Sequence, residues 1–204
     1  MEGIVTETRG FPELKPVAAP PELDGFAAAV RRLQDLAVST APDSATWRAA
    51  TDQIEGICDV LEPFAVPDGQ APAGRAITLP GLGHPLMPPW TITSSDEGGV
   101  TMEGHFTRFH VGGNMAVHGG VVPLFYDWHF GMVVSAAGRP ISRTAYLHVD
   151  YRAITPIDAP LISRGHIERV DGRKAFITAT MTDADGTVLS EANGLMIKLL
   201  PHQP

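Results

Sequence analysis

In the C-terminal half of the chain, one segment has the apolar pattern of a helix, and the segments on both sides of it have the pattern of strands. Residues 118–137, which begin HGGVVPLFYDWHFG, are apolar almost all the way round a helix. A helix of this kind belongs in a protein core. Segments in which apolar and polar residues alternate lie on both sides of it, a pattern typical of strands with one covered face. This order predicts an antiparallel sheet wrapped around one central helix.

Six strand-like segments flank the central helix in the sequence. Asp171-Gly172 and Asp185-Gly186 are hairpin dipeptides between the last three. The four segments after the helix are expected to form an antiparallel meander. In the first of these four, the alternation places Leu147 and Val149 on one face and Thr144 on the other. The six segments cover residues 90–95, 99–111, 143–154, 159–170, 174–184 and 188–200.

The N-terminal part has a different pattern. Apolar residues at three- and four-residue spacings predict a helix from Asp24 and a second helix with Ser44 as its N-cap. Their apolar stripe is large, so we expect this helical hairpin to dock on the core. The proline- and glycine-rich residues 63–89 predict an extended linker. We therefore divide the chain into an extension, residues 1–84, and a main domain, residues 85–204.

Composition narrows the choice of partners. The chain has 204 residues, 44% of them hydrophobic, and a formal net charge of -8. No basic stripe is present, which argues against nucleic acid as a partner. No segment is long and apolar enough to span a membrane, and a single cysteine, Cys58, fits a reducing compartment. These features predict a soluble cytoplasmic protein with no membrane partner.

One charged residue interrupts the apolar central helix. Asp127 lies in its middle, where a carboxylate is costly unless it is paired, hydrogen-bonded or protonated. In one interpretation Asp127 points to a polar seam and meets a backbone donor. In the other it lies in a dry cleft with a shifted pKa and takes part in a reaction.

The residues around Asp127 resemble a known family. His118-Gly119-Gly120, an acid nine positions after the histidine, and the following strand TAYLHVDYRAITPI are similar to the hotdog-fold acyl-CoA thioesterases, specifically the phenylacetyl-CoA thioesterase-like (PaaI-like) branch. The resemblance covers about residues 85–200. It implies an α+β hotdog fold, here with an N-terminal helical hairpin. It also implies a thioester hydrolase that acts on acyl-CoA, with coenzyme A as part of the substrate and no separate cofactor. The expected assembly is a homodimer or a homotetramer built as a dimer of dimers.

The same resemblance suggests catalytic roles. The backbone N–H groups at a helix N-terminus lack intrahelical partners, and glycine allows a ligand to approach closely. By resemblance the Gly119 N–H stabilises the oxyanion, and Gly120 lies beside the substrate. Asp127 acts either as general base for water or as nucleophile, and the sequence does not choose. His118 either holds the loop or contacts the thioester. Thr144 either positions the water or is an ordinary outward-facing threonine.

The remaining candidates concern substrate binding. Many relatives carry an asparagine six residues before the motif histidine, where this chain has Gly112. Asn114 lies nearby and is a candidate substitute. Trp128 is bulkier than usual for the family and is expected to narrow the acyl pocket. Arg139 and Arg143 are candidates to meet the phosphates of coenzyme A.

Two other functions compete with acyl-CoA hydrolysis. A hotdog protein can bind acyl-CoA without cleaving it, and some hotdog proteins are dehydratases or hydratases, whose motif is not found here. The histidines His105, His110 and His148 lack the paired spacing of a metal site, so no metal is expected. The acyl group, the choice between coenzyme A and acyl carrier protein, and the choice between dimer and tetramer stay open.

Overall fold

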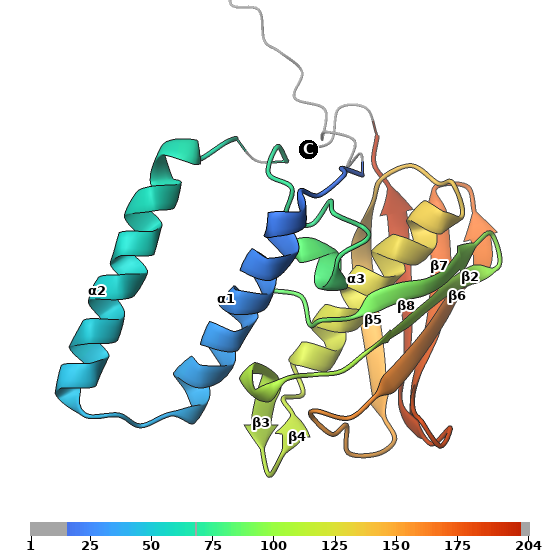
Figure 1. Cartoon of the computed structure of the whole chain (residues 1–204). Helices are drawn as coiled ribbons and strands as arrows, with labels where there is room; N and C mark the ends of the chain where they lie inside the picture. The colour runs from blue at the N-terminus through green and yellow to red at the C-terminus, as the bar shows by residue number, and fades with distance from the viewer. Residues whose placement is uncertain (1–15, 68, 201–204) are drawn as a thin grey trace, which may run out of the picture.

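The computed structural model describes residues 16–67 and 69–200. Its centre is a helix, α3 (Val121–Ala136), held against one face of a six-stranded antiparallel sheet (Figure 1). The expected α+β hotdog architecture is therefore confirmed, including the two additional N-terminal helices.

The strands and outer helices have clear boundaries. In chain order they are α1 (Pro21–Ser39), α2 (Ser44–Leu61), the 3₁₀ turns η1 (Glu62–Phe64) and η2 (Pro80–Gly83), β1 (Thr91–Asp96), β2 (Gly99–Gly104), η3 (Arg108–His110), β3 (Val111–Gly113), β4 (Ala116–Val117), then after α3 β5 (Ser142–Tyr151), β6 (Leu161–Asp171), β7 (Lys174–Asp183) and β8 (Val188–Lys198).

The core forms where α3 meets the sheet. Phe125 and Phe130 of the helix are fully buried, and Trp90 lies 4.3 Å from Phe125 between ring centroids. Gly194 on β8 leaves room for Phe130, because a Cβ at position 194 would lie 2.7 Å from that ring. The apolar residues of α3 thus account for its burial, as the sequence predicted.

The order of strands in the sheet differs from a simple meander. The sheet runs β1-β2-β6-β7-β8-β5, so β5 pairs with β8 and not with its sequence neighbour β6. The predicted four-stranded meander is wrong on this point. The reason is that β2 already occupies the free edge of β6. The chain crosses from β5 to the far side of the sheet before β6 begins.

A bulge in β5 changes which residues face the helix. Thr144 pairs with Met196 and Tyr146 pairs with Leu195, so one extra residue is inserted between Thr144 and Tyr146. Paired residues share a face of a sheet. Because Met196 is buried against the core, Thr144 faces the helix together with Leu147. The simple alternation had placed Thr144 on the opposite face.

The segment expected as one strand over residues 99–111 is broken. β2 ends at Gly104, whose position is pressed against Trp90: a Cβ there would lie 2.6 Å from the indole ring. The chain then turns at Thr107, whose backbone N–H donates to His110 Nδ1 at 2.9 Å. The short β3–β4 hairpin that follows turns at Asn114 and Met115, which have φ of 49° and 60°.

Helix α1 is docked on the core, as expected. Its Arg31 guanidinium donates to the carbonyl of Pro80 at 2.8 Å, and its Asp35 carboxylate accepts from the Phe109 N–H at 2.8 Å. The helix begins at Pro21, earlier than the predicted Asp24, and proline suits this first position because its missing N–H is not needed there.

Helix α2 behaves differently from the prediction. No residue of α2 is buried, so within the single chain it does not dock on the core. Its N-cap is Asp43 and not Ser44, because the Asp43 carboxylate accepts from the Thr46 N–H at 2.8 Å. The region after α2 is more than an extended linker, since Ala76 and Leu82 are buried.

Candidate active site

The start of α3 holds the predicted glycine motif. Gly120 is the N-cap, and its N–H donates to His118 Nδ1 at 3.0 Å. The His118 carbonyl in turn accepts from Val121 N–H at 2.9 Å. Among the described residues, the Gly119 N–H has no hydrogen-bond acceptor. The turn therefore leaves one backbone donor open at the positive end of the helix dipole.

Tyr151 fixes the peptide next to this donor. Its hydroxyl donates to the Gly119 carbonyl at 2.5 Å, from the helix-facing side of β5. Burial raises the pKa of Tyr151, so the hydroxyl stays protonated and able to donate. The Gly119–Gly120 peptide is thus held at its carbonyl by Tyr151 and at its N–H by His118. Tyr151 was not among the residues predicted for the site, although strict alternation places it on the same face as Leu147 and Val149.

A pocket opens beside this peptide. Its volume is about 410 Å³, and a Cβ added to Gly119 would meet only the Tyr151 hydroxyl oxygen, at 3.8 Å. The open space lets a ligand approach the Gly119 backbone. Most of the lining is apolar: Ala116, Val117, Gly119, Val122, Tyr151, Arg152, Ala153, Ile154 and Thr155.

Asp127 and Thr144 are brought together by the bulge in β5. The Thr144 hydroxyl donates to Asp127 Oδ1 at 2.6 Å, and it lies 3.1 Å from the Met196 sulfur. This bond orients the carboxylate and leaves Asp127 Oδ2 available to accept a proton or to attack a carbonyl.

The surroundings of Asp127 differ from the dry cleft considered above. Asp127 is exposed in the single chain, and its partner is a side-chain hydroxyl, not a backbone donor. The helix therefore has one uncovered strip, in contrast to the all-round burial expected from its composition. Asp127 is eight residues beyond Gly119, which corresponds to about 12 Å along the helix axis.

The other predicted binding residues lie away from the glycine turn. Asn114 is at the tip of the β3–β4 hairpin and lines a separate pocket with Phe109. Trp128 is buried in the core, 6.0 Å from Phe125 between ring centroids. Arg139 follows the C-terminal end of α3 and donates to the Gly172 carbonyl at 3.2 Å. Arg143 pairs with Ile197, which places it on the sheet face opposite Thr144.

Gly112, the position where the resemblance led us to expect asparagine, has no room for a side chain. A Cβ at this position would lie 2.7 Å from the His118 Cα. The backbone of the glycine turn would have to move to admit any side chain there. Glycine at position 112 therefore allows the His118 backbone to lie where it does.

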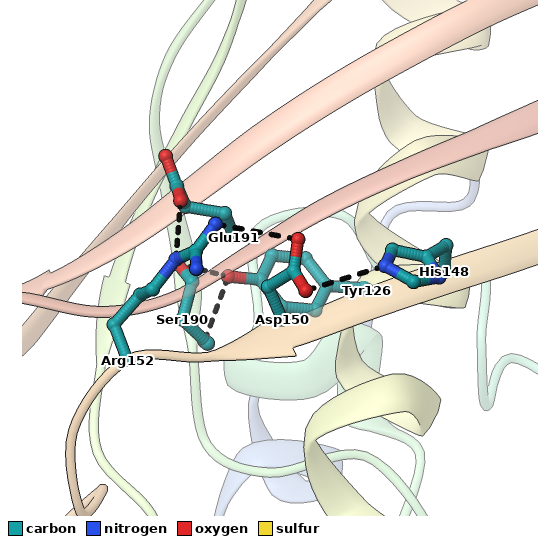
Figure 2. A network of polar contacts seen from close by, with 6 residues as sticks. All are labelled: Tyr126, His148, Asp150, Arg152, Ser190 and Glu191. Carbon is teal, nitrogen blue, oxygen red and sulfur yellow. Dashed lines mark hydrogen bonds and ion pairs between the residues drawn. The ribbon is translucent and has the colours of Figure 1, made fainter.

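The far side of the sheet from Asp127 carries a charged network. Arg152 donates to Glu191 at 2.7 Å and lies 3.4 Å from Asp150, so its charge is already paired (Figure 2). Tyr126 reaches from α3 to Ser190 on the covered face of the same strands, with 2.9 Å to the Ser190 carbonyl. The network ties β5 to β8 and leaves Arg152 little free charge for a phosphate.

His129 points from α3 into the core, on the opposite side from Asp127. It is fully buried, with Nε2 3.1 Å from the Val100 carbonyl and Nδ1 3.0 Å from the Ser163 hydroxyl. Because a carbonyl only accepts, Nε2 carries the proton and Nδ1 accepts from Ser163. Burial lowers the pKa of His129 to about 4, so the ring is neutral near pH 7.

Two further findings concern metal ions and membrane spans. Within residues 16–67 and 69–200, no group of three histidine, cysteine or acidic residues is placed to hold a metal ion. No helix in the same part of the chain is long and apolar enough to cross a membrane.

Comparison with known sequences points to one family. The model of the thioesterase superfamily matches residues 114–190, which contain the glycine turn, Asp127 and Thr144. Acyl-coenzyme A thioesterase THEM4 of Rattus norvegicus is 33% identical over 89 residues, 43% of this chain and 38% of that protein. THEM4 of Xenopus laevis is 34% identical over 86 residues, 41% of this chain and 38% of that protein. The chain thus spans 38% of the length of these curated relatives.

Solved structures agree. A crystal structure of a thioesterase superfamily protein has a TM-score of 0.75 and 27% identity, covering 90% of this chain and 97% of that one. A hypothetical thioesterase protein of Streptococcus pneumoniae, solved with coenzyme A, has a TM-score of 0.51 and 18% identity over 53% of this chain and 86% of its own. Residues 114–190 are thus similar to the thioesterase superfamily, and most of the chain shares its fold with a solved protein of that superfamily.

Proposed function

We propose that the chain hydrolyses an acyl-CoA thioester, as a member of the PaaI-like branch. The observation that carries this proposal is the pairing of an open backbone donor with an oriented carboxylate on one helix. The Gly119 N–H has no acceptor among the described residues, and Asp127 is held by Thr144 at 2.6 Å. An oxyanion donor and a base or nucleophile are the two groups that thioester hydrolysis requires.

The substrate class rests on relatives. The matched proteins of rat and frog are named acyl-coenzyme A thioesterases, and one structural neighbour was solved with coenzyme A. The apolar pocket of about 410 Å³ beside Gly119 suits part of an acyl or pantetheine chain. In this proposal residues 85–204 carry the hotdog unit and residues 1–84 form an extension.

We also propose that two copies of the chain share each site. Gly119 and Asp127 of one chain are about 12 Å apart along the axis of α3. A single carbonyl with its attacking water bridges only roughly 6–7 Å between two hydrogen-bonding groups. A second copy that places its Gly119 opposite Asp127 would bring the groups together and would cover the exposed strip of α3. The unpaired edge strand β5 is suited to such a contact.

The direct test measures hydrolysis of acyl-CoAs and, separately, binding of an analogue that cannot be hydrolysed. Purified protein is given a panel of short, long and aromatic acyl-CoAs, and free coenzyme A is measured with a thiol reagent. Cys58 is exposed and reacts with such reagents, so a Cys58→Ser variant provides the low-background enzyme. Calorimetry with a non-hydrolysable thioether analogue reports binding alone. Hydrolysis of at least one thioester is expected; binding with no hydrolysis across the panel would instead favour a non-catalytic acyl-CoA-binding protein.

Tyr151→Phe tests whether the clamped peptide matters for the reaction. The variant keeps the ring in the pocket and removes only the hydroxyl that donates to the Gly119 carbonyl. We expect kcat to fall about tenfold, equivalent to roughly 1.4 kcal/mol, with KM nearly unchanged. Tyr146→Phe is the matched control, because Tyr146 lies on the same strand and faces the other way. Equal kinetics for the two variants would remove Tyr151 from the site.

A further inference from the structure

An apolar stripe on α2 has no partner among residues 16–67 and 69–200. Trp47, Ala50, Ile54, Ile57 and Leu61 follow one another at spacings of three and four residues, the pattern of a seam between packed helices. The large side chains stay exposed, from 37% for Ile54 to 51% for Ile57. An 18-residue helix that packs on nothing is marginally stable in water. The stripe therefore needs another apolar surface to pack against.

Helix α1 presents a second exposed apolar face. One side of α1 is docked on the core through Ala27 and Arg31. Phe26, Leu33 and Leu36 lie on another side and are 41–43% exposed. The two helices run antiparallel and are joined by the short segment 40–43 (Figure 1). Both exposed faces therefore belong to one helical hairpin.

We propose that this hairpin packs against the same hairpin of a second copy of the chain, forming a four-helix bundle. Seven large apolar side chains on the two faces are each 37–51% exposed, and a stable interface buries about 800 Å² on each partner, which calls for an extended apolar patch of this kind. A two-fold interface buries the same patch on both copies, so one hairpin is sufficient to cover the other.

The distribution of charge fits a copy of this acidic chain. The positions that flank the seam of α2 carry no charge, so two chains of net charge -8 can meet there without opposed carboxylates. The flanking residues are Thr51, Gln53, Cys58 and Val60. The charged residues of α2 lie on its outer side: Arg48, Asp52, Glu55 and Asp59.

Cys58 provides a probe of this contact. It is the chain's single cysteine, it is exposed, and it lies beside the seam. A nitroxide attached to Cys58 of the full-length protein is expected to show a narrow inter-chain distance below roughly 40 Å by pulsed dipolar spectroscopy, since each helix is only about 10–12 Å across. Ile57→Asp places a charge in the seam. We expect this variant to lose that narrow distance and part of its helical circular dichroism.

Ala49→Asp is the matched control. It adds the same charge to the outer side of the same helix, where Ala49 is exposed, and is expected to keep the wild-type distance. The wild-type protein with no inter-chain distance would overturn the proposal; α2 would then fold back on its own α1 or bind a different protein. The proposal also fails if Ile57→Asp retains the wild-type distance. None of these outcomes depends on thioesterase activity.

Discussion

Asp127→Asn is expected to lower kcat for the proposed acyl-CoA hydrolysis by about 10²–10⁴-fold. Asparagine has nearly the same shape as aspartate, and its side-chain oxygen can still accept the hydrogen bond from Thr144. The amide cannot take a proton from water and cannot form an anhydride with the acyl group. The chemical step is therefore lost by either route, while the bound substrate keeps its contacts.

The measurement is kcat and KM of purified Asp127→Asn, with its melting temperature as a check on folding. Because Asp127 is exposed and makes one hydrogen bond, the melting temperature is expected to change little. Asp150→Asn is the control, since Asp150 is also exposed but lies on the opposite face of the sheet. Turnover at the wild-type rate in purified Asp127→Asn would exclude Asp127 as base and nucleophile.

Acidification from pH 6.5 to pH 4 is expected to remove about 3 kcal/mol of stability through His129 alone. In the folded chain burial lowers the pKa of His129 to about 4, whereas in the unfolded chain it is near 6.5. Between these values the unfolded chain binds more protons. The stabilisation from a neutral His129 is therefore full above pH 6.5 and is lost as the pH falls to 4.

Urea unfolding at several pH values measures this contribution. His129→Gln keeps polar groups near Val100 and Ser163 but does not titrate, so its stability is expected to fall less steeply below pH 6.5 than that of the wild type. Comparison of slopes removes the effect of all other titrating groups. His166→Gln makes the same substitution at an exposed histidine on β6 and is the matched control. Parallel wild-type and His129→Gln curves would contradict the prediction.

Local patterns in the sequence were sufficient to predict the central helix and the tight turns. The helix predicted over residues 118–137 is α3 in the structure. Most of its surface is apolar, and such a helix is stable only when it is buried. Gly172 and Gly186 adopt φ of 56° and 85°, the conformation for which glycine is used in hairpin turns. Asp127 was singled out as a charge in an apolar helix, and the glycine turn before α3 was identified through its resemblance to a family motif.

The details of the candidate site depended on contacts between distant segments. The alternation in β5 assigned Thr144 to the wrong face, and a bulge, which periodicity does not report, turned it toward Asp127. Tyr151 lies 32 residues from Gly119, and no local pattern connects the two. The lack of room for a side chain at position 112 is visible only in the structure, where the His118 backbone lies close to Gly112.

The sequence by itself determined most of the helices and strands and pointed to the candidate site residues, because hydrophobic period and turn propensity are local properties of the chain. Only the tertiary structure decided that β5 lies beside β8, that Asp127 is exposed and that α1 docks while α2 does not. The physical reason is that strand pairing and burial depend on which surfaces other segments already occupy. An apolar stripe shows that a helix needs a partner, but it does not show whether that partner is its own chain.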